Sequence, residues 1–345
     1  MQNSSNSTIS PSGSRGLSDY LRLIRLPNLV FLAFIQLLIN RSLLMPILQT
    51  FGFDTSGNSM LNITLLIFAT ALIAAGGYAL NDYFDIKIDA INKPSKQIVG
   101  KSVSRQTAML LHQILTITGV CIGLFLSFLT RSFSLAFVFI VVPGLLWFYS
   151  SNYKRQFVTG NLVVAFNAAL SILVVAIMEL AVLQRQYGDL IFGTAIPRTF
   201  YTWTGGFALF AFLCTWIREI IKDMEDEGGD REMECRTMPI KWGWKRTKGF
   251  LYGLIGLGIT GLFAANSLIP FEGSLSFRYI VFGCVFPFVA LAYLVFRATT
   301  PEDFHQASIL SKVIMLTGTL YCLIFYFLTA QASGIKIFNL FLVNP

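Results

Sequence analysis

Long apolar windows alternate with short polar connections along most of this chain. Nine windows are long enough for a helix to cross a bilayer. They cover residues 27–49, 60–80, 105–129, 133–151, 160–183, 203–222, 249–270, 278–296 and 309–331. Only Thr130, Arg131 and Ser132 separate the third window from the fourth, which predicts a tight helical hairpin. The pattern predicts an all-α polytopic membrane protein with about nine transmembrane helices.

The composition agrees with this pattern and excludes a soluble domain. Of 345 residues, 54% are hydrophobic and only 13% are charged, and the mean hydropathy is +0.65. Residues 1–18 are rich in Ser, Asn and Gly and contain no long apolar run, so we expect a disordered tail there and not a signal peptide. Residues 19–345 then form a single transmembrane domain.

The basic residues lie mostly on one side of the predicted membrane. If the N-terminus is cytoplasmic, twenty of the 26 Lys and Arg residues fall in cytoplasmic segments, as the positive-inside rule requires. This asymmetry accounts for the net charge of +8 without a nucleic-acid partner. An odd number of helices places the C-terminus outside, and we expect the plasma membrane as the location. Five scattered cysteines and two histidines are too few, and too dispersed, for a multi-histidine haem or zinc site.

The acidic residues are concentrated in two short stretches. Eleven of the eighteen lie within residues 82–89 and 219–234, each directly after an apolar window, and helix parity places both on the cytoplasmic face. Both stretches have the spacing D-x-x-D-x-x-x-D, and each is followed by residues that break helices, Asn92-Lys93-Pro94 in one and Gly228-Gly229 in the other. The repeat predicts two related halves, about 19–157 and 158–345. Its aspartates are Asp82, Asp85, Asp89, Asp223, Asp226 and Asp230.

Such rows of carboxylates indicate a site for a hard cation. If the helix continues past residue 80, Asn81, Asp85 and Asp89 share one helical face. Anionic groups at the mouth of an apolar bundle are costly unless a cation compensates them. Carboxylate oxygens suit Mg²⁺, which takes one or two protein carboxylates and completes its shell with water and phosphate oxygens. Two facing rows could therefore hold Mg²⁺ around a diphosphate, with help from basic residues nearby in sequence: Lys93, Lys96, Lys154, Arg155, Lys222 and Arg236.

The remainder of the chain suits a substrate with a long apolar tail. It contains 32 Phe, 12 Tyr and 5 Trp residues. Chemistry that fits is the ionisation of an allylic diphosphate, in which cations stabilise the leaving group. Aromatic faces would stabilise the allylic carbocation by about 0.5–2 kcal/mol each. An acceptor nucleophile would then capture the cation.

Several motifs resemble the UbiA superfamily of intramembrane prenyltransferases. The first is N-D-x-x-D-x-x-x-D at residues 81–89 with Asn92-Lys93-Pro94 after it, and the second is D-x-x-x-D at 226–230, followed by Arg236-Thr237-x-Pro239. The resemblance extends to Arg25-Leu26-Pro27-Asn28 and to Tyr149, Lys154-Arg155 and Gly160-Asn161. It implies a nine-helix bundle around a central lipid-open cavity and Mg²⁺-dependent transfer of a prenyl group from its diphosphate to a lipophilic acceptor.

The resemblance also implies roles for individual residues. Asp85, Asp89, Asp226 and Asp230 would be catalytic and, with Asn81, would hold Mg²⁺ and diphosphate, while Asp82 and Asp223 would support them. Arg25 and the six basic residues named above would bind diphosphate. Tyr149 and Tyr153 would contact the prenyl group or carbocation, and Asn28 and Asn161 would be polar groups of the cavity.

The run from Arg218 to Arg231 most resembles members that transfer geranylgeranyl to geranylgeranylglyceryl phosphate in ether-lipid synthesis. A member acting on an aromatic acceptor, in quinone or haem and chlorophyll side-chain synthesis, is the alternative. The chain departs from the family after Pro94, where N-K-P-D-R-P is common and Ser95-Lys96-Gln97 stands here. Lys96 keeps the positive charge without the bidentate fork of arginine.

Other interpretations of the same residues exist. The first carboxylate row could be a solvated loop, Lys93 and Lys96 could serve topology alone, and Arg25 could extend to the interface. Tyr149 and Tyr153 could belong to an interfacial aromatic belt. An ion-coupled transporter would place carboxylates near mid-membrane on broken helices, whereas these lie at helix ends. A CDP-alcohol phosphotransferase would begin its motif with D-G-x-x-A-R, which neither row contains, and a non-catalytic scaffold gives no reason for two matched rows.

Overall fold

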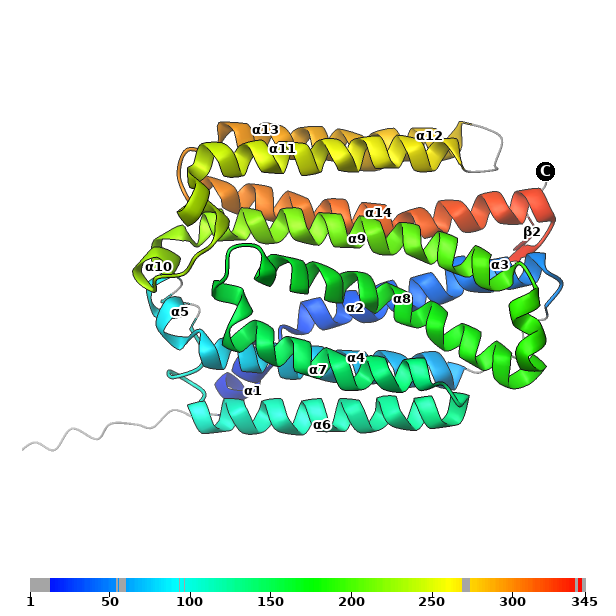
Figure 1. Cartoon of the computed structure of the whole chain (residues 1–345), viewed down its shortest axis with the longest axis horizontal. Helices are drawn as coiled ribbons and strands as arrows, with labels where there is room; N and C mark the ends of the chain where they lie inside the picture. Colours follow the sequence, from blue (N-terminus) through cyan, green and yellow to red (C-terminus); the bar gives the residue numbers. More distant parts are fainter. Residues whose placement is uncertain are drawn as a thin grey trace, which may run out of the picture.

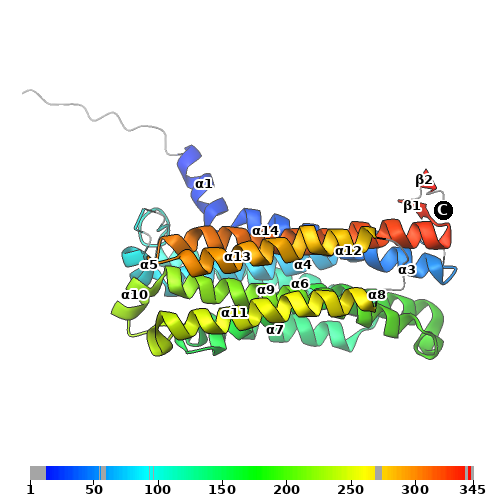
Figure 2. The same ribbon diagram turned by 90° about the horizontal axis from the view of Figure 1, so that it is seen from above.

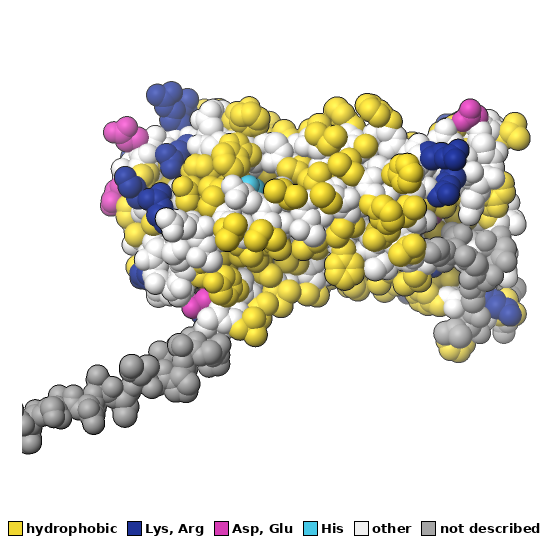
Figure 3. All heavy atoms as spheres, turned by 90° about the horizontal axis from the view of Figure 1, so that it is seen from below, with side chains coloured by type: hydrophobic (Ala, Val, Ile, Leu, Met, Phe, Trp, Pro, Cys, Tyr) yellow, Lys and Arg dark blue, Asp and Glu magenta, His cyan; other side chains and the backbone are white. Residues whose placement is uncertain are grey.

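The helices of this protein form one bundle in which they run nearly along a common axis (Figures 1 and 2). The structure is a computed structural model that describes residues 13–53, 55, 60–92, 94–95, 97–268, 274–338 and 341–342, with side chains from residue 16 onward. Nine helical spans of the described chain are long and apolar enough to cross a membrane, which confirms the predicted fold class. A broad hydrophobic band separates clusters of Lys and Arg near the two ends of the molecule (Figure 3).

The nine spans follow the predicted windows in order. Their elements, with the short helices and strands that adjoin them, are α1 (Gly13–Leu23), α2 (Leu26–Ile39), η1 (Asn40–Leu44), α3 (Met45–Thr50), α4 (Met60–Phe84), α5 (Ile86–Asn92), α6 (Arg105–Thr130), α7 (Phe133–Ser151), η2 (Tyr153–Arg155), α8 (Thr159–Tyr187), η3 (Gly188–Gly193), α9 (Ile196–Glu225), α10 (Glu227–Glu232), α11 (Met238–Ser267), α12 (Leu275–Tyr279), η4 (Ile280–Val285), α13 (Phe286–Arg297), α14 (Asp303–Ser333), β1 (Lys336–Ile337) and β2 (Phe341–Leu342). The two strands pair antiparallel.

Two helices extend well beyond their apolar windows. The sixth span begins at Ile196, where the window begins at residue 203, and the seventh begins at Met238 instead of 249. The helix of the sixth span runs through these polar residues without a break, because polar residues can leave the bilayer while remaining helical. In the seventh span, Gly243 has a positive φ (72°), so the polar beginning of α11 is joined to the rest by a kink. Hydropathy therefore underestimates how far the helices reach toward the ends of the bundle.

The predicted hairpin between the third and fourth spans is present. Arg131 ends α6 with a left-handed backbone (φ 53°), and the side chain of Ser132 caps α7 by accepting a hydrogen bond from the Leu135 amide at 3.3 Å. Residues 13–18, which we expected to belong to a disordered tail, are helical in α1. This short helix has Leu17, Tyr20 and Leu21 on one face, and that amphipathic spacing supports it, while Leu23 at its end is buried. Residues 1–12 lie outside the described chain.

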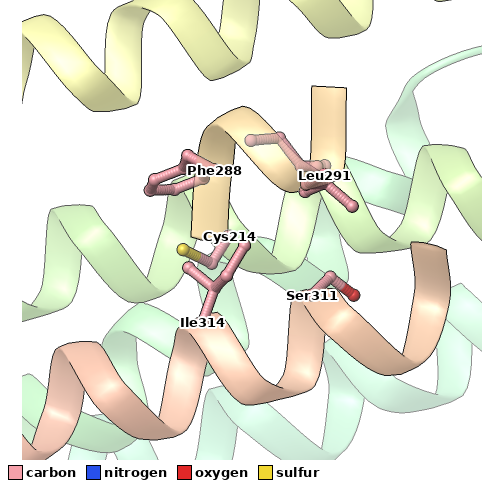
Figure 4. Close-up of a pocket in the computed structure, with 6 residues that line it drawn as sticks. Cys214, Phe288, Leu291, Ser311 and Ile314 are labelled. Atoms are coloured by element: carbon pink, nitrogen blue, oxygen red, sulfur yellow. The ribbon is translucent and has the colours of Figure 1, made fainter. Parts of the chain in front are cut away.

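Small residues bring α4 and α6 close together. A Cβ atom on Gly119 would lie 2.9 Å from the carbonyl oxygen of Ala69, so glycine is needed for this approach. In the second half of the bundle, α9, α13 and α14 meet around Cys214, Phe288, Leu291 and Ile314, which are buried (Figure 4). Ser311, at the same place, donates its hydroxyl to the Ser308 carbonyl at 2.7 Å, so the contact is packed core.

A buried polar pair connects η1 with the second half of α8. Asn40, in the π-helical turn η1, donates to the Glu179 carboxylate at 2.6 Å, and both side chains are buried. This contact joins the first and fifth spans. It gives both groups a partner inside the bundle, which indicates a structural role for Glu179.

Candidate active site

The first carboxylate row lies where α4 ends and α5 begins. Regular helix is interrupted at Asp85, but the backbone amide of Asp85 still bonds the Asn81 carbonyl at 3.0 Å, and that of Asp89 bonds the Asp85 carbonyl at 2.8 Å. The i to i+4 hydrogen bonding of a helix is therefore kept across the interruption at Asp85. The predicted alignment of these three residues on one side of the chain survives, although the helix does not run through without interruption.

The second row repeats this arrangement between α9 and α10. Here the interruption falls at Asp226, whose amide bonds the Lys222 carbonyl at 2.8 Å, while the Asp230 amide bonds the Asp226 carbonyl at 3.2 Å. Gly228 and Gly229 lie inside α10, so the expectation that they break the helix is wrong. They are spanned by helical hydrogen bonds, and the break comes at the aspartate, as it does in the first row.

Both rows contribute to one cavity at the end of the bundle where α5 and α10 lie. Figure 1 shows these two short helices together at that end, opposite the C-terminus. Oxygen donors and basic groups line the same space, with few apolar side chains among them. The lining residues are Ile88, Asp89, Asn92, Tyr149, Lys154, Arg155, Asn161, Glu219, Lys222, Asp223, Asp226, Asp230 and Cys235.

Lys154 connects the cavity to the buried part of the first row. Its ammonium forms an ion pair with the carboxylate of Asp85, whose second partner is the Asn81 amide at 2.6 Å. Burial acts to lower the pKa of Lys154, but the Asp85 carboxylate outweighs it and holds this pKa above its usual value. The loop carrying Lys154 packs directly on Gly160, where a Cβ atom would lie 2.7 Å from the Tyr153 carbonyl. A glycine at 160 therefore positions the lysine.

The leading aspartate of each row has a different kind of partner. Asp82 accepts an ionic hydrogen bond from Arg25 at 3.0 Å, and the guanidinium also lies 4.8 Å from the centre of the Tyr78 ring. Asp223 accepts from the neutral amide of Asn161 at 2.8 Å. Arg25 has a left-handed backbone (φ 52°) just before α2, which is an uncommon conformation for a residue other than glycine.

Asn92 joins the two rows directly. Its side-chain amide donates to the carbonyl of Asp226 at 3.1 Å, and its side-chain oxygen accepts from the backbone amide of Gly229 at 2.8 Å. A Cβ atom at position 229 would overlap the Asn92 side chain, whereas position 228 has open space. The residue that ends α5 thus uses both halves of its amide to hold the turn between α9 and α10.

The chemistry of these donors fits magnesium. They are carboxylate and amide oxygens, and the described part of the cavity wall contains no histidine. Within the described residues no three acidic, histidine or cysteine side chains converge closely enough to hold one ion. Each ion would therefore take one or two carboxylates and complete its shell from phosphate oxygens and water, which is the coordination that Mg²⁺ prefers. Burial raises the pKa of Asp230 to about 6, so a nearby cation would favour its ionised form.

Comparison with known proteins identifies the family. The model of the UbiA prenyltransferase family matches residues 43–313, which is most of the chain and includes both rows. This chain belongs to the UbiA prenyltransferase family. The resemblance seen in the motifs is confirmed, and with it the prediction that the protein is a membrane enzyme that transfers prenyl groups.

Relatives of this prenyltransferase share a common description. It is 29% identical over 262 residues to the digeranylgeranylglyceryl phosphate synthase of Sulfurisphaera tokodaii, covering 75% of this chain and 84% of the relative. The synthase of the same name from Saccharolobus solfataricus is 29% identical over 316 residues, covering 88% and 94%. That of Methanococcus aeolicus is 32% identical over 228 residues, covering 65% and 68%.

Solved structures support the fold of the prenyltransferase. A structure of digeranylgeranylglyceryl phosphate synthase has a TM-score of 0.57 and 24% identity, and the match covers 90% of this chain and 99% of that one. A UbiA homolog from Archaeoglobus fulgidus bound to GPP and Mg²⁺ has a TM-score of 0.52 and 14% identity, covering 88% and 99%.

The structure brings most of the predicted site residues of the prenyltransferase together, and leaves some apart. Arg236 is exposed and contributes its backbone amide to the Arg155 carbonyl at 2.8 Å, so its side chain is not in the cavity wall. Tyr153 stacks on Phe148 outside that wall. Asn28 is exposed and makes one long hydrogen bond, 3.5 Å, to the Tyr78 hydroxyl. Lys93 and Lys96 lie outside the described residues.

Four lining residues were not predicted as site residues. Glu219 could have been found, because it precedes Asp223 by four positions and so shares its helical face. Asn92 was assigned only to a helix-breaking sequence, although its amide proves to be the link between the rows. Ile88 and Cys235 carried no signal, since an isoleucine and a lone cysteine in a polar segment resemble ordinary packing residues.

Proposed function

We propose that this prenyltransferase transfers a geranylgeranyl group from its diphosphate to geranylgeranylglyceryl phosphate in a Mg²⁺-dependent reaction. The observation that carries the proposal is the single cavity into which both carboxylate rows and three basic side chains project. The names of the relatives support the acceptor, and the structure of a homolog with GPP and Mg²⁺ supports the metal and the class of donor.

The polar residues of the cavity would have two functions, binding Mg²⁺ and binding the diphosphate of the donor. Asp89, Asp226 and Asp230 would hold Mg²⁺, which supplies charge stabilisation to the departing diphosphate when bound. Lys154, Arg155 and Lys222 would contact the diphosphate oxygens directly. Asn81 and Asp85 contact the Lys154 ammonium and would position it.

The chemical step is the same for any hydroxyl acceptor. The bond between the allylic carbon and the diphosphate oxygen breaks, and the electron pair leaves with diphosphate. The acceptor oxygen bonds to that carbon and loses its proton. Tyr149 is the aromatic residue of the described cavity wall, so its ring is placed to face the developing allylic cation. The prenyl tail would extend from the cavity along apolar side chains of the bundle.

An assay of diphosphate release tests this proposal. Purified protein in lipid is incubated with geranylgeranyl diphosphate, Mg²⁺ and one acceptor at a time: geranylgeranylglyceryl phosphate or an aromatic acid such as 4-hydroxybenzoate. We expect release and a doubly alkylated glyceryl phosphate only with the first acceptor, and loss of release in EDTA. Prenylation of the aromatic acid alone would overturn the acceptor, and release that persists in EDTA would overturn the metal.

We further propose that the cavity faces the cytoplasm and that the C-terminus lies outside, in the plasma membrane. The charge distribution supports this orientation, because the basic clusters flank the end with α5 and α10. Labelling of cysteines introduced at exposed Lys245 and at Lys336, with an impermeant maleimide in intact cells, would test it. Labelling at 245 without labelling at 336 would reverse the orientation.

A further inference from the structure

A second group of basic side chains lies beside the cavity, toward α2 and α14. Arg218 and Lys222 are one turn apart on α9, Arg25 directly precedes α2, and Lys312 is on α14. Helix α14 packs against both α2 and α9. Lys312 lies within electrostatic reach of Arg25 and Arg218, and Lys222 within reach of the same two arginines.

Two of these four cations are paired with a carboxylate and two are not. Arg218 bonds Glu219 at 2.6 Å and Arg25 bonds Asp82. Glu225 and Asp226 lie within electrostatic reach of Lys312 and Lys222, respectively. Among the described residues, however, neither lysine has an ion-pair partner within bonding distance. The buried Nε of Arg218 has no hydrogen-bond acceptor there either. Like charges held close together at the edge of a membrane protein are costly, and an anion placed among them would relieve that cost.

An apolar surface begins directly beside these cations. Exposed side chains follow one face of α2 at helical spacing, and another set follows the face of α14 that carries Lys312. Both sets lead from the charged end into the hydrophobic band of the bundle. They are Leu26, Val30, Phe34 and Leu37 on α2, and Ile309, Val313 and Leu316 on α14. A molecule with an anionic head and apolar tails matches this combination of charge and surface.

We propose that Arg25, Arg218 and Lys312 form a second anion-binding subsite, which takes the phosphate monoester of the lipid acceptor. The inference rests on the proposed function and adds the place where the acceptor binds. Glu219 and Lys222, which neighbour Arg218 on α9, line the diphosphate cavity, so a phosphate held here would place a neighbouring hydroxyl beside the donor. The phosphate monoester itself is unchanged in the reaction and serves for recognition.

The Arg218–Glu219 pair separates the two anionic groups. Glu219 is within electrostatic reach of Arg25, Arg218, Lys222 and Lys154, so this one carboxylate lies between the basic residues of the cavity and those of the subsite. Two phosphate-bearing substrates that must react together repel each other. A carboxylate with cations on both sides keeps their sites distinct while allowing their carbon skeletons to meet.

The test removes one charge at a time and compares two acceptors. Lys312→Met and Arg218→Met keep a flexible stem and lose the cation, and Lys245→Met, an exposed lysine of α11, is the matched control. Steady-state rates are measured with geranylgeranylglyceryl phosphate and with geranylgeranylglycerol, which lacks the phosphate. We expect the KM for the phosphorylated acceptor to rise about tenfold in Arg218→Met and about threefold to tenfold in Lys312→Met. The KM for the prenyl diphosphate should change less than about twofold in Lys312→Met.

The preference for the phosphorylated acceptor is the decisive quantity. In the wild type and in Lys245→Met it should be large, and in both subsite variants it should shrink by the same factor as the KM change. An unchanged preference in Lys312→Met overturns the subsite while leaving the proposed function intact. A rise confined to the KM of the prenyl diphosphate would assign these cations to the donor instead.

A binding measurement tests the subsite even if the purified protein shows no turnover. Thermal unfolding of the wild type is followed with each lipid and with inorganic phosphate alone. Greater stabilisation by the phosphorylated lipid than by the alcohol, lost in Lys312→Met, supports the subsite even if no diphosphate is released. Equal stabilisation by the two lipids overturns it. Stabilisation by inorganic phosphate that equals that of the lipid would show a general anion site without a role in lipid recognition.

Discussion

The two carboxylate rows have the same spacing and the same interrupted backbone, yet they are held in different ways. In the first row the aspartate at the interruption, Asp85, is only 3% exposed and is paired with Lys154 and Asn81. In the second row the corresponding Asp226 lines the cavity, and Asn92 holds its backbone carbonyl. Equal spacing therefore does not mean equal surroundings. The middle aspartate of the first row is paired with a lysine of the protein, whereas that of the second row lines the cavity.

The strongest test of this difference removes each of the two aspartates. We expect Asp226→Ala and Asp85→Ala each to lower the rate of diphosphate release by about 10²–10³-fold, the size of loss seen when one preorganised electrostatic group leaves a reacting centre. The reasons differ, since the first variant loses a metal oxygen and the second loses the partner that positions Lys154. Retention of near-wild-type rates by both well-folded variants would remove the rows from the site.

The ion pair of the first row provides the next test. Lys154→Met leaves the Asp85 carboxylate buried without its cation, so we expect a loss of stability of about 3 kcal/mol along with loss of activity. The double variant Lys154→Met/Asp85→Asn should recover stability, measured by thermal unfolding in detergent, but not activity. No recovery in the double variant would show that the destabilisation has a cause other than the unpaired carboxylate.

A methyl group added at position 229 should strain the contact of Asn92 with the turn between α9 and α10. Gly229→Ala should overlap the Asn92 side chain and cost about 1–3 kcal/mol, together with reduced turnover. The matched control is Gly228→Ala, where the structure has open space, and it should unfold at or above the wild-type temperature. Equal behaviour of the two alanine variants would contradict the close contact with Asn92.

The partners of the leading aspartates should give the smallest effect. Arg25 is 39% exposed at its side chain, so a double-mutant cycle between Arg25→Met and Asp82→Asn should give a coupling of about 1 kcal/mol or less. The cycle between Asn161→Ala and Asp223→Asn, inside the cavity wall, should give about 1 kcal/mol or more. The reverse order would show that the first row, and not the second, is the more tightly held.

Much of this molecule follows from periodicity and spacing. The nine spans follow from hydropathy, and the two rows follow from one repeated pattern of aspartates. What could not be predicted depends on contacts between residues distant in sequence. The pairing of Asp85 with Lys154 crosses 69 positions, and Asn92 meets the Asp226 turn across 134. Arg236 shows the opposite error, because closeness in sequence to a carboxylate row placed it in the site while its side chain points outward.

The contact made by Asn92 also has a consequence for how the protein is made. Ribosomes deliver the first half of the chain to the membrane while the backbone groups that Asn92 binds, at Asp226 and Gly229, have not yet been synthesised. Four further spans must be inserted before these groups exist. The first carboxylate row therefore lacks its contacts with the second row until the sixth helix has been made. The wall of the cavity is incomplete until then.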